Sequence, residues 1–117
     1  MPESTVLSIR LNLPNGTRFG PGKAQLLGSI DQTGSISGAA RLLGMSYPRA
    51  LRLVNEMNSQ FEKPLVEKFQ GGANRGGATL TDAGKDIYTL YMSIVRCSTK
   101  STHKQTKTLS DLASFRI

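Results

Sequence analysis

Apolar and polar residues alternate near the start of the chain, in the segment from Leu7 to Leu13. Leucine or isoleucine stands at every odd position of that segment, and polar residues stand between them. A period of two residues is typical of a half-buried β-strand. The Asn15-Gly16 pair then favours a two-residue hairpin turn, followed by a short return strand at residues 17–19. The pattern predicts an N-terminal strand or hairpin within residues 1–19.

Helical spacing of the apolar residues replaces this alternation after residue 20. It predicts three helices, at about residues 21–32, 37–43 and 46–59. The second helix has the clearest apolar face, with residues at the i, i+3, i+4 and i+7 positions: Ile36, Ala39, Ala40 and Leu43. The two alanines allow a neighbouring helix to approach closely.

Start and stop signals punctuate this helical region. Ser37 can cap the second helix and Ser46 the third, because a serine hydroxyl accepts hydrogen bonds from the free backbone N–H groups at a helix start. Gly44 stands where a helix end favours a left-handed residue. Two short helices joined by a turn of three or four residues that contains a glycine form a helix-turn-helix.

A predicted β-hairpin follows directly. Residues 65–70 have the composition of a strand, residues 71–77 form a basic, glycine-rich loop, and residues 78–80 favour a return strand. Thr81 can then cap a last helix that extends to about Arg96. A hairpin after a helix-turn-helix is a wing, so the predicted fold is mainly α with a small β part: a winged helix-turn-helix with a three-helix core and a long C-terminal helix.

The chain divides into three predicted parts. Residues 1–19 hold the N-terminal strand or hairpin, and residues 20–96 hold the winged helix-turn-helix with its last helix. Residues 97–117 are rich in Ser, Thr and Lys, which predicts a flexible basic tail. The alternative for this tail is a short docked helix that uses Leu109, Leu112 and Phe115.

Composition supports an anionic partner inside the cell. The chain carries 15 Lys and Arg against 8 Asp and Glu, a net charge of +7, which suits a nucleic acid. Its single cysteine, Cys97, excludes an internal disulfide and fits a reducing cytoplasm. No apolar run approaches the ~18 residues of a membrane span, and the N-terminus lacks the apolar core of a signal peptide. We therefore expect a cytoplasmic, nucleoid-associated protein.

The outer face of the third helix is the predicted base-reading surface. Arg49 and Arg52 project together there, and the arginine fork matches the O6 and N7 atoms of guanine in the major groove. Ser46 and Tyr47 stand at the start of the same helix, where they can bind phosphate. In a helix without this context, two exposed arginines would more often be merely solvated.

Phosphate contacts are also predicted for the second helix and the wing. Ser35 and Ser37 begin the second helix, whose N-terminus offers free N–H groups to phosphates; the alternative is that they only cap it. In the wing, Arg75 is the predicted minor-groove probe. Its predicted companions in the wing are Lys68, Gln70, Gly72 and Asn74. A nucleotide-binding loop is excluded, because the G-x-x-x-x-G-K-[ST] pattern is missing.

Catalysis finds no support in the sequence. His103 is the only histidine and lies in the polar tail, and Cys97 has no histidine nearby in the sequence. No residues have the spacing of metal ligands. We expect no enzyme activity, no cofactor and no metal.

Several short motifs together resemble a known family. Thr-Gly-Ser-Ile-Ser at residues 33–37, Leu-Thr-Asp-Ala-Gly at residues 80–84 and the wing are similar to the winged-helix domain of LysR-type regulators. Met-Ser-Tyr at residues 45–47, Asn-Glu-Met-Asn at residues 55–58 and the long glycine-rich wing resemble more closely the N-terminal DNA-binding domain of ModE-type, molybdate-responsive regulators. The resemblance covers residues 20–95.

This resemblance implies a dimeric bacterial transcription regulator with its third helix in the major groove and its wing on the DNA backbone or in the minor groove. ModE-type proteins continue into oxyanion-binding domains, whereas this sequence stops after a short tail. We therefore expect no sensor domain and do not carry the molybdate response over. Pro48 stands where the family often has a polar or basic residue, which removes a possible DNA contact.

The resulting hypothesis is a sequence-specific DNA-binding regulator, with repression by occlusion of a promoter as the expected output. A palindromic operator and a homodimer formed through the apolar stripe of the last helix would accompany it. One alternative is a winged-helix interaction module that regulates another transcription factor. A weaker alternative is non-specific architectural binding driven by the tail. The sequence identifies no operator, regulated gene or small-molecule effector.

Overall fold

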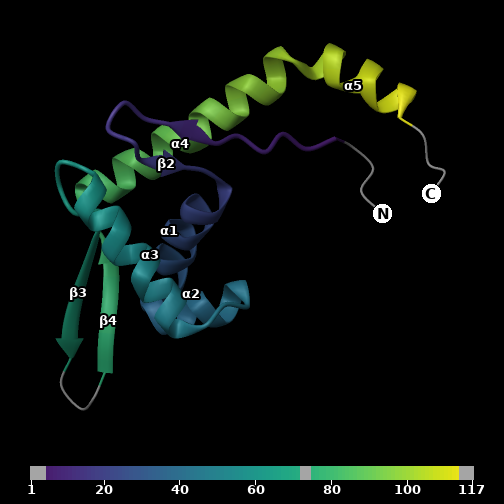
Figure 1. Cartoon of the computed structure of the whole chain (residues 1–117). Helices are drawn as coiled ribbons and strands as arrows, with labels where there is room; N and C mark the ends of the chain where they lie inside the picture. The colour runs from purple at the N-terminus through teal and green to yellow at the C-terminus, as the bar shows by residue number, and fades with distance from the viewer. Residues whose placement is uncertain (1–4, 72–74, 114–117) are drawn as a thin grey trace.

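The three-helix unit and the wing appear in a computed structural model of the whole chain (Figure 1), which describes residues 5–71 and 75–113. The architecture is mainly helical with two small antiparallel hairpins, and it confirms the predicted winged helix-turn-helix. The elements in chain order are β1 (Leu11–Asn12), β2 (Arg18–Phe19), α1 (Pro21–Thr33), α2 (Ile36–Leu43), α3 (Tyr47–Gln60), β3 (Val66–Gly71), β4 (Arg75–Leu80), α4 (Asp82–Ser101) and α5 (His103–Leu112).

The core lies where α1, α2 and α3 meet the base of the wing. Each helix contributes the residues that its apolar spacing predicts, and each large side chain that is buried contributes roughly 1.5–3 kcal/mol to folding. The wing adds residues only at its base, so most of β3 and β4 projects beyond the core. The fully buried large side chains include Leu26, Leu27 and Ile30 of α1, Val54 and Met57 of α3, and Leu65.

The N-terminal hairpin is smaller than predicted. Only two residue pairs form, including Leu11 opposite Phe19, and residues 5–10 are not a strand. The turn spans three residues rather than two, because Leu13 N–H donates to the Thr17 carbonyl at 2.8 Å and Gly16 N–H to the Leu13 carbonyl at 2.9 Å. Gly16 has φ 89°, a left-handed conformation that suits such a three-residue turn.

Aromatic contacts attach this hairpin to two helices. The Phe19 ring meets the Phe61 ring edge-on at a centroid distance of 6.1 Å and the Tyr91 ring at 5.2 Å. The Tyr91 hydroxyl also donates to the Ile9 carbonyl at 2.5 Å. The hairpin therefore lies between the C-terminal end of α3 and the middle of α4.

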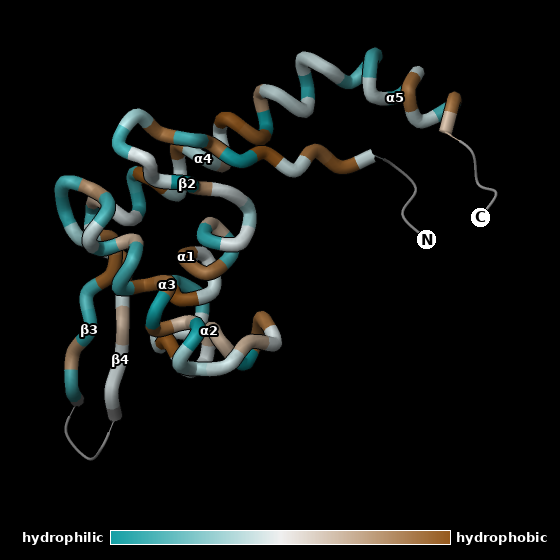
Figure 2. The backbone as a smooth tube through the Cα atoms, in the orientation of Figure 1, coloured by the Kyte–Doolittle hydropathy of each residue, from teal (hydrophilic) through white to brown (hydrophobic). Residues whose placement is uncertain are grey.

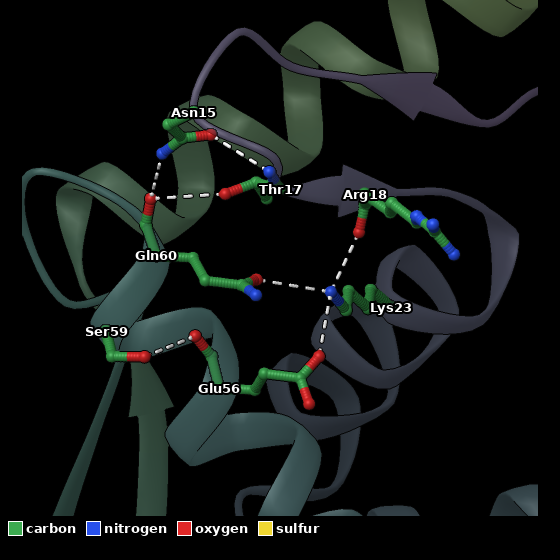
Figure 3. Close-up of polar contacts among 7 residues, drawn as sticks. All are labelled: Asn15, Thr17, Arg18, Lys23, Glu56, Ser59 and Gln60. Atoms are coloured by element: carbon green, nitrogen blue, oxygen red, sulfur yellow. Dashed lines mark hydrogen bonds and ion pairs between the residues drawn. The ribbon is translucent and has the colours of Figure 1, made fainter.

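A polar network joins the same hairpin to α1 and α3 (Figure 3). Lys23 Nζ donates to the Arg18 carbonyl at 2.8 Å and lies 3.2 Å from a Glu56 carboxylate oxygen. At the end of α3, the Gln60 carbonyl accepts a hydrogen bond from Asn15 Nδ2 at 2.9 Å. The hairpin turn thus satisfies a backbone acceptor that the helix end leaves free.

The C-terminal region is more helical than predicted. The last helix was expected to end near Arg96, before a flexible tail, but α4 continues to Ser101 and α5 follows. The short-helix alternative is therefore the better description of residues 103–112. Its leucines do not dock as that alternative expected, because Leu109 is 69% and Leu112 80% exposed. No helix in the described residues is both long and apolar enough to cross a membrane.

Together α4 and α5 form an arm that extends away from the core (Figure 1). The radius of gyration is 16.9 Å, whereas a compact domain of about 100 residues has roughly 13 Å. Figure 2 shows hydrophobic stretches in the N-terminal segment and in α4, which run side by side. A helical arm that keeps apolar residues in water is a surface suited to a second protein chain.

Candidate nucleic-acid interface

A three-residue turn sets the geometry of the helix-turn-helix. Gly44 ends α2 in the left-handed conformation, with φ 68°, as the sequence predicts. Met45 N–H then donates to the Ala40 carbonyl at 3.0 Å, which satisfies an acceptor at the helix end. The chain re-enters a helix at Tyr47, so α2 and α3 pack against each other across the turn.

Serine hydroxyls cap both helices, although one cap is not the predicted residue. Ser46 caps α3 as predicted, since its hydroxyl accepts from Arg49 N–H at 3.2 Å. For α2 the cap is Ser35 rather than Ser37, because Ser35 Oγ accepts from Gly38 N–H at 2.8 Å. The prediction of Ser37 as the cap was wrong, and Ser37 is instead exposed in the first turn of the helix.

Backbone conformation explains why Ser35 rather than Ser37 caps α2. Gly34 ends α1 with φ 77°, and Ser35 follows in an extended conformation, so α2 can begin at Ile36. Gly38 leaves room for the cap, because a Cβ there would lie 2.7 Å from Ser35 Oγ. The glycine before the cap and the glycine three residues after it therefore select Ser35.

Helix α3 presents the predicted arginines to solvent. Ala50, Val54 and Met57 are buried on its inner side, while Arg49 and Arg52 are exposed. Tyr47 at the helix start is 48% exposed, so it belongs to the candidate interface rather than to the core. Pro48 occupies the first turn, where a missing N–H costs nothing.

The wing has longer strands and a shorter loop than predicted. β3 and β4 pair antiparallel over six positions, from Val66 opposite Leu80 to Gly71 opposite Arg75. The return strand thus begins at Arg75 rather than at residue 78, which corrects the predicted loop of residues 71–77. The predicted contacts Gly72 and Asn74 lie outside the described residues, as does the side chain of Arg75.

Hydrogen bonds fix the wing relative to both helices of the motif. Ala78 N–H donates to the Gly34 carbonyl at 2.9 Å, which joins β4 to the start of α2. The side-chain amide of Asn58, on α3, binds the backbone of Leu65 and Val66 at 2.8–3.0 Å. The wing and the helix-turn-helix are therefore one connected surface.

An open cleft of about 630 Å³ lies between the wing, the start of α2 and the start of α3. It brings together five of the predicted contact residues, whereas the N-cap Ser46 and the α3 residues Arg49 and Arg52 lie outside its lining. It also contains Phe69, for which the sequence predicts no role. The lining residues are Ser35, Ile36, Ser37, Tyr47, Lys68, Phe69, Gln70, Gly76 and Gly77.

The electrostatics of this surface favour a polyanion. Arg41, Arg49, Arg52 and Lys68 are exposed, and within the part of the chain that the structure describes none of them forms an ion pair. The start of α2 adds backbone N–H groups and the positive end of a helix dipole. Such a surface attracts a polyanion electrostatically. The described residues hold no cluster of His, Cys, Asp and Glu that could hold a metal ion.

Comparison with known proteins agrees with this geometry. Residues 23–85 match the family described as bacterial regulatory helix-turn-helix protein, lysR family. The molybdenum-pterin-binding protein MopB of Rhodobacter capsulatus is 43% identical over 79 residues, which are 68% of this chain and 29% of that protein. The transcriptional regulator ModE of Yersinia pestis is 45% identical over 71 residues, 61% of this chain and 27% of that protein. The chain thus spans under a third of the length of these relatives.

Solved structures with the same fold include a transcription regulator and a DNA-binding domain. MepR, a transcription regulator of a Staphylococcus aureus multidrug efflux pump, has a TM-score of 0.63 at 19% identity and covers 81% of each chain. The DNA-binding domain of CbnR, in a complex with DNA, has a TM-score of 0.58 at 18% identity and covers 75% of this chain and 95% of that one. These likenesses support the winged-helix fold, and the matched family and ModE are described as regulators rather than enzymes.

Proposed function

The chain belongs to the lysR family of bacterial regulatory helix-turn-helix proteins, and on this premise we propose that it is a transcription regulator that recognises a specific operator as a homodimer and represses by covering a promoter. As a member of this family, the chain has DNA as its partner. The observation that carries the proposal is the pair of exposed arginines on α3, which form no ion pair within the described residues. They stand beside a cleft whose lining offers hydroxyl, N–H and ammonium groups to phosphate. Such a protein acts in the cytoplasm, on the nucleoid.

Base readout falls to the outer face of α3 in this proposal. Arg49 and Arg52 are one helical turn apart, so both reach the same stretch of the major groove. Each arginine offers two parallel donors to a guanine, and a good bidentate pair discriminates by about 1–3 kcal/mol against the wrong base. The serine cap at Ser46 holds the helix start where its N–H groups face the DNA backbone.

Phosphate binding falls to the rim of the cleft. Ser37 and Tyr47 are exposed in the lining of the cleft, near the starts of α2 and α3, and Lys68 adds a charge from the wing. Ser35 contributes its backbone and the cap that it forms on α2 to this phosphate site, while Gln70 contributes an uncharged hydrogen-bond donor. Gly72, Asn74 and Arg75 remain proposed contacts at the end of the wing, where a narrow minor groove attracts arginine.

The homodimer is proposed to form through α4. Leu90 is 60% and Ile94 39% exposed, although both stand on the apolar stripe of that helix. They border an apolar groove that also contains Phe61 and Ile87, and a second copy of the arm would remove this surface from water. Two-fold symmetry then calls for half-sites about 10–10.5 base pairs apart, or a multiple of that spacing.

Selection of bound duplexes from a random DNA pool tests the proposal. Wild type should enrich a palindromic motif, and the Arg49→Ala, Arg52→Ala double variant should not. A Lys104→Ala, Lys107→Ala double variant is the matched control, because it loses the same charge from α5, far from the cleft, and should enrich the wild-type motif. If neither wild type nor control enriches a motif, specific recognition is wrong and an interaction with another regulator becomes the better interpretation.

Two further measurements test the assembly and the output. Mass from light scattering should be that of a dimer for wild type and of a monomer for a Leu90→Glu, Ile94→Glu variant. Transcription in vitro from a promoter that contains the selected motif should fall as protein is added. A monomeric wild type, or a rise in transcription, would contradict the homodimer or the repressor role respectively.

A further inference from the structure

An exposed aromatic ring stands on the wing, inside the candidate interface. Phe69 on β3 is 53% exposed, and it lines the cleft together with Tyr47 and Lys68. An isolated exposed Phe needs no explanation on its own. Phe69 is different because its neighbours are the phosphate-binding groups of the proposed interface.

The opposite strand is built to hold this ring. Gly77 on β4 stands directly opposite Phe69, and a Cβ at Gly77 would lie 2.6 Å from a Phe69 ring carbon. The ring therefore lies across the glycine, in the space that a side chain would occupy. The same Cβ would lie 3.4 Å from the Gly34 carbonyl oxygen, so this part of β4 is in close contact with the turn between α1 and α2.

This arrangement directs the ring toward the helix-turn-helix. Ala78, next to Gly77, donates its N–H to the Gly34 carbonyl, and Gly34 precedes the serine that caps α2. Figure 1 places the wing alongside the three-helix unit. The exposed part of the ring thus borders the cleft in which Ser35 and Ser37 offer donors to a phosphate.

Three kinds of group meet in this cleft: hydroxyl and N–H donors, a lysine ammonium, and an apolar ring. A DNA backbone offers their complements, since its phosphates accept hydrogen bonds and attract the lysine, while its deoxyribose rings present apolar C–H faces. We propose that Phe69 is a further DNA-contacting residue, whose ring packs on a deoxyribose of the strand whose phosphate lies at the start of α2. This inference rests on the proposed function and adds an uncharged contact to it.

A contact with sugar has a signature that neither a base nor a phosphate contact shares. Sugars carry no sequence, so Phe69→Ala should weaken binding to operator and random duplex by the same factor, about tenfold for the loss of an aromatic contact. The ring releases no counterions, so the salt dependence of binding should stay that of wild type. Lys68→Ala is the matched comparison, because it should flatten the salt dependence.

A tryptophan at this position gives a direct readout, because the chain has no Trp. The fluorescence of a Phe69→Trp variant should become protected from acrylamide quenching when duplex DNA is added. Leu109→Trp is the control, since Leu109 is 69% exposed on α5, away from the cleft, and its fluorescence should be unaffected.

The outcomes separate this inference from the proposed function. If both tryptophan variants bind DNA in a gel-shift assay but the indole of the Phe69→Trp variant stays open to acrylamide, the ring does not contact DNA and only this inference is wrong. A loss on Phe69→Ala that is confined to the operator would also overturn it, in favour of a base contact. If wild type fails to bind any duplex, the proposed function itself is wrong.

Discussion

Asn58 on α3 pairs with the backbone of Val66 on the wing through both ends of its side-chain amide. Its Oδ1 accepts from Val66 N–H at 3.0 Å, and its Nδ2 donates to the Val66 carbonyl at 3.0 Å. Oδ1 also accepts from Leu65 N–H at 2.8 Å. One side chain therefore supplies hydrogen-bond partners to the backbone where β3 begins. It also fixes the distance between α3 and the wing, the two parts of the interface that it joins.

Replacing Asn58 should destabilise the protein. Asn58→Ala removes three hydrogen bonds and leaves partly buried backbone groups without partners, which should lower the free energy of unfolding by about 2 kcal/mol. Asn55→Ala is the control, because Asn55 is exposed on the same helix and its loss should change stability by under about 0.5 kcal/mol. Urea unfolding followed by circular dichroism measures both. Equal effects of the two substitutions would show that the Asn58 bonds contribute little.

Local signals in the sequence were sufficient for α1, α2 and α3 and for the order of the elements as far as α4. The spacing of Ile36, Ala39 and Ala40 identified the buried side of α2. Gly44 marked the end of that helix, and Ser46 marked the start of α3. The capping signal was less reliable at the start of α2, where two serines compete for the cap position. Ser35 and Ser37 are equally good caps by residue type, and the choice depends on Gly34 turning left-handed one residue earlier.

Tyr91 links stability to alkaline pH. Burial raises the pKa of its hydroxyl above the usual 10.0 by desolvation, so folding favours the neutral phenol. The stability this group contributes is present below pH 10 and is lost as pH rises from 10 through the raised pKa of the folded state. Tyr91→Phe should cost about 1 kcal/mol at pH 7, because it loses the hydrogen bond to Ile9.

The gap in unfolding free energy between wild type and Tyr91→Phe should therefore narrow above pH 10. Urea unfolding at pH 7, 9 and 10.5 measures this gap, and contributions common to the two proteins cancel in the difference. A gap that stays constant to pH 10.5 would mean that the Tyr91 hydroxyl titrates alike in the folded and unfolded states.

Capping and phosphate binding can be separated at the start of α2. Ser35→Ala removes the cap and should lower the free energy of unfolding by about 1 kcal/mol. Ser37→Ala removes an exposed hydroxyl from the same turn and should leave stability within about 0.5 kcal/mol of wild type. If Ser37 binds phosphate, its loss should still weaken DNA binding. Thermal unfolding and a binding titration on both variants test this, and unchanged DNA binding by Ser37→Ala would remove the Ser37 hydroxyl from the proposed DNA contacts.

Long-range pairing accounts for what sequence reasoning missed at the interface. Phe69 looked like an ordinary strand residue, and its position over Gly77 depends on a register between strands that no local pattern specifies. The ion pair between Lys23 on α1 and Glu56 on α3 joins residues 33 positions apart in the chain, and no local sequence pattern predicts it either. The extension of α4 to Ser101 was missed for another reason. Ser and Thr disfavour helix interiors in isolation, so residues 97–101 were expected to be flexible, whereas in the structure they continue α4.

Salt dependence should distinguish the residues that bind phosphate from those that read bases. Each phosphate that the protein neutralises contributes a slope of about −0.9 to the plot of log binding constant against log salt concentration. Lys68→Ala should therefore reduce the magnitude of the slope by about one, and it should weaken operator and random DNA alike. Titrations between about 50 and 200 mM salt cover the range in which this effect is large.

Arg52→Ala should behave differently if Arg52 reads a base. It should weaken operator binding by about 1–3 kcal/mol and affect random DNA much less, because a guanine contact exists only on the right sequence. The comparison of Lys68→Ala with Arg52→Ala on two duplexes is therefore self-controlled, since each variant loses one positive charge. Equal losses for Arg52→Ala on operator and random DNA would place Arg52 on the backbone, and base readout would then rest on Arg49 alone.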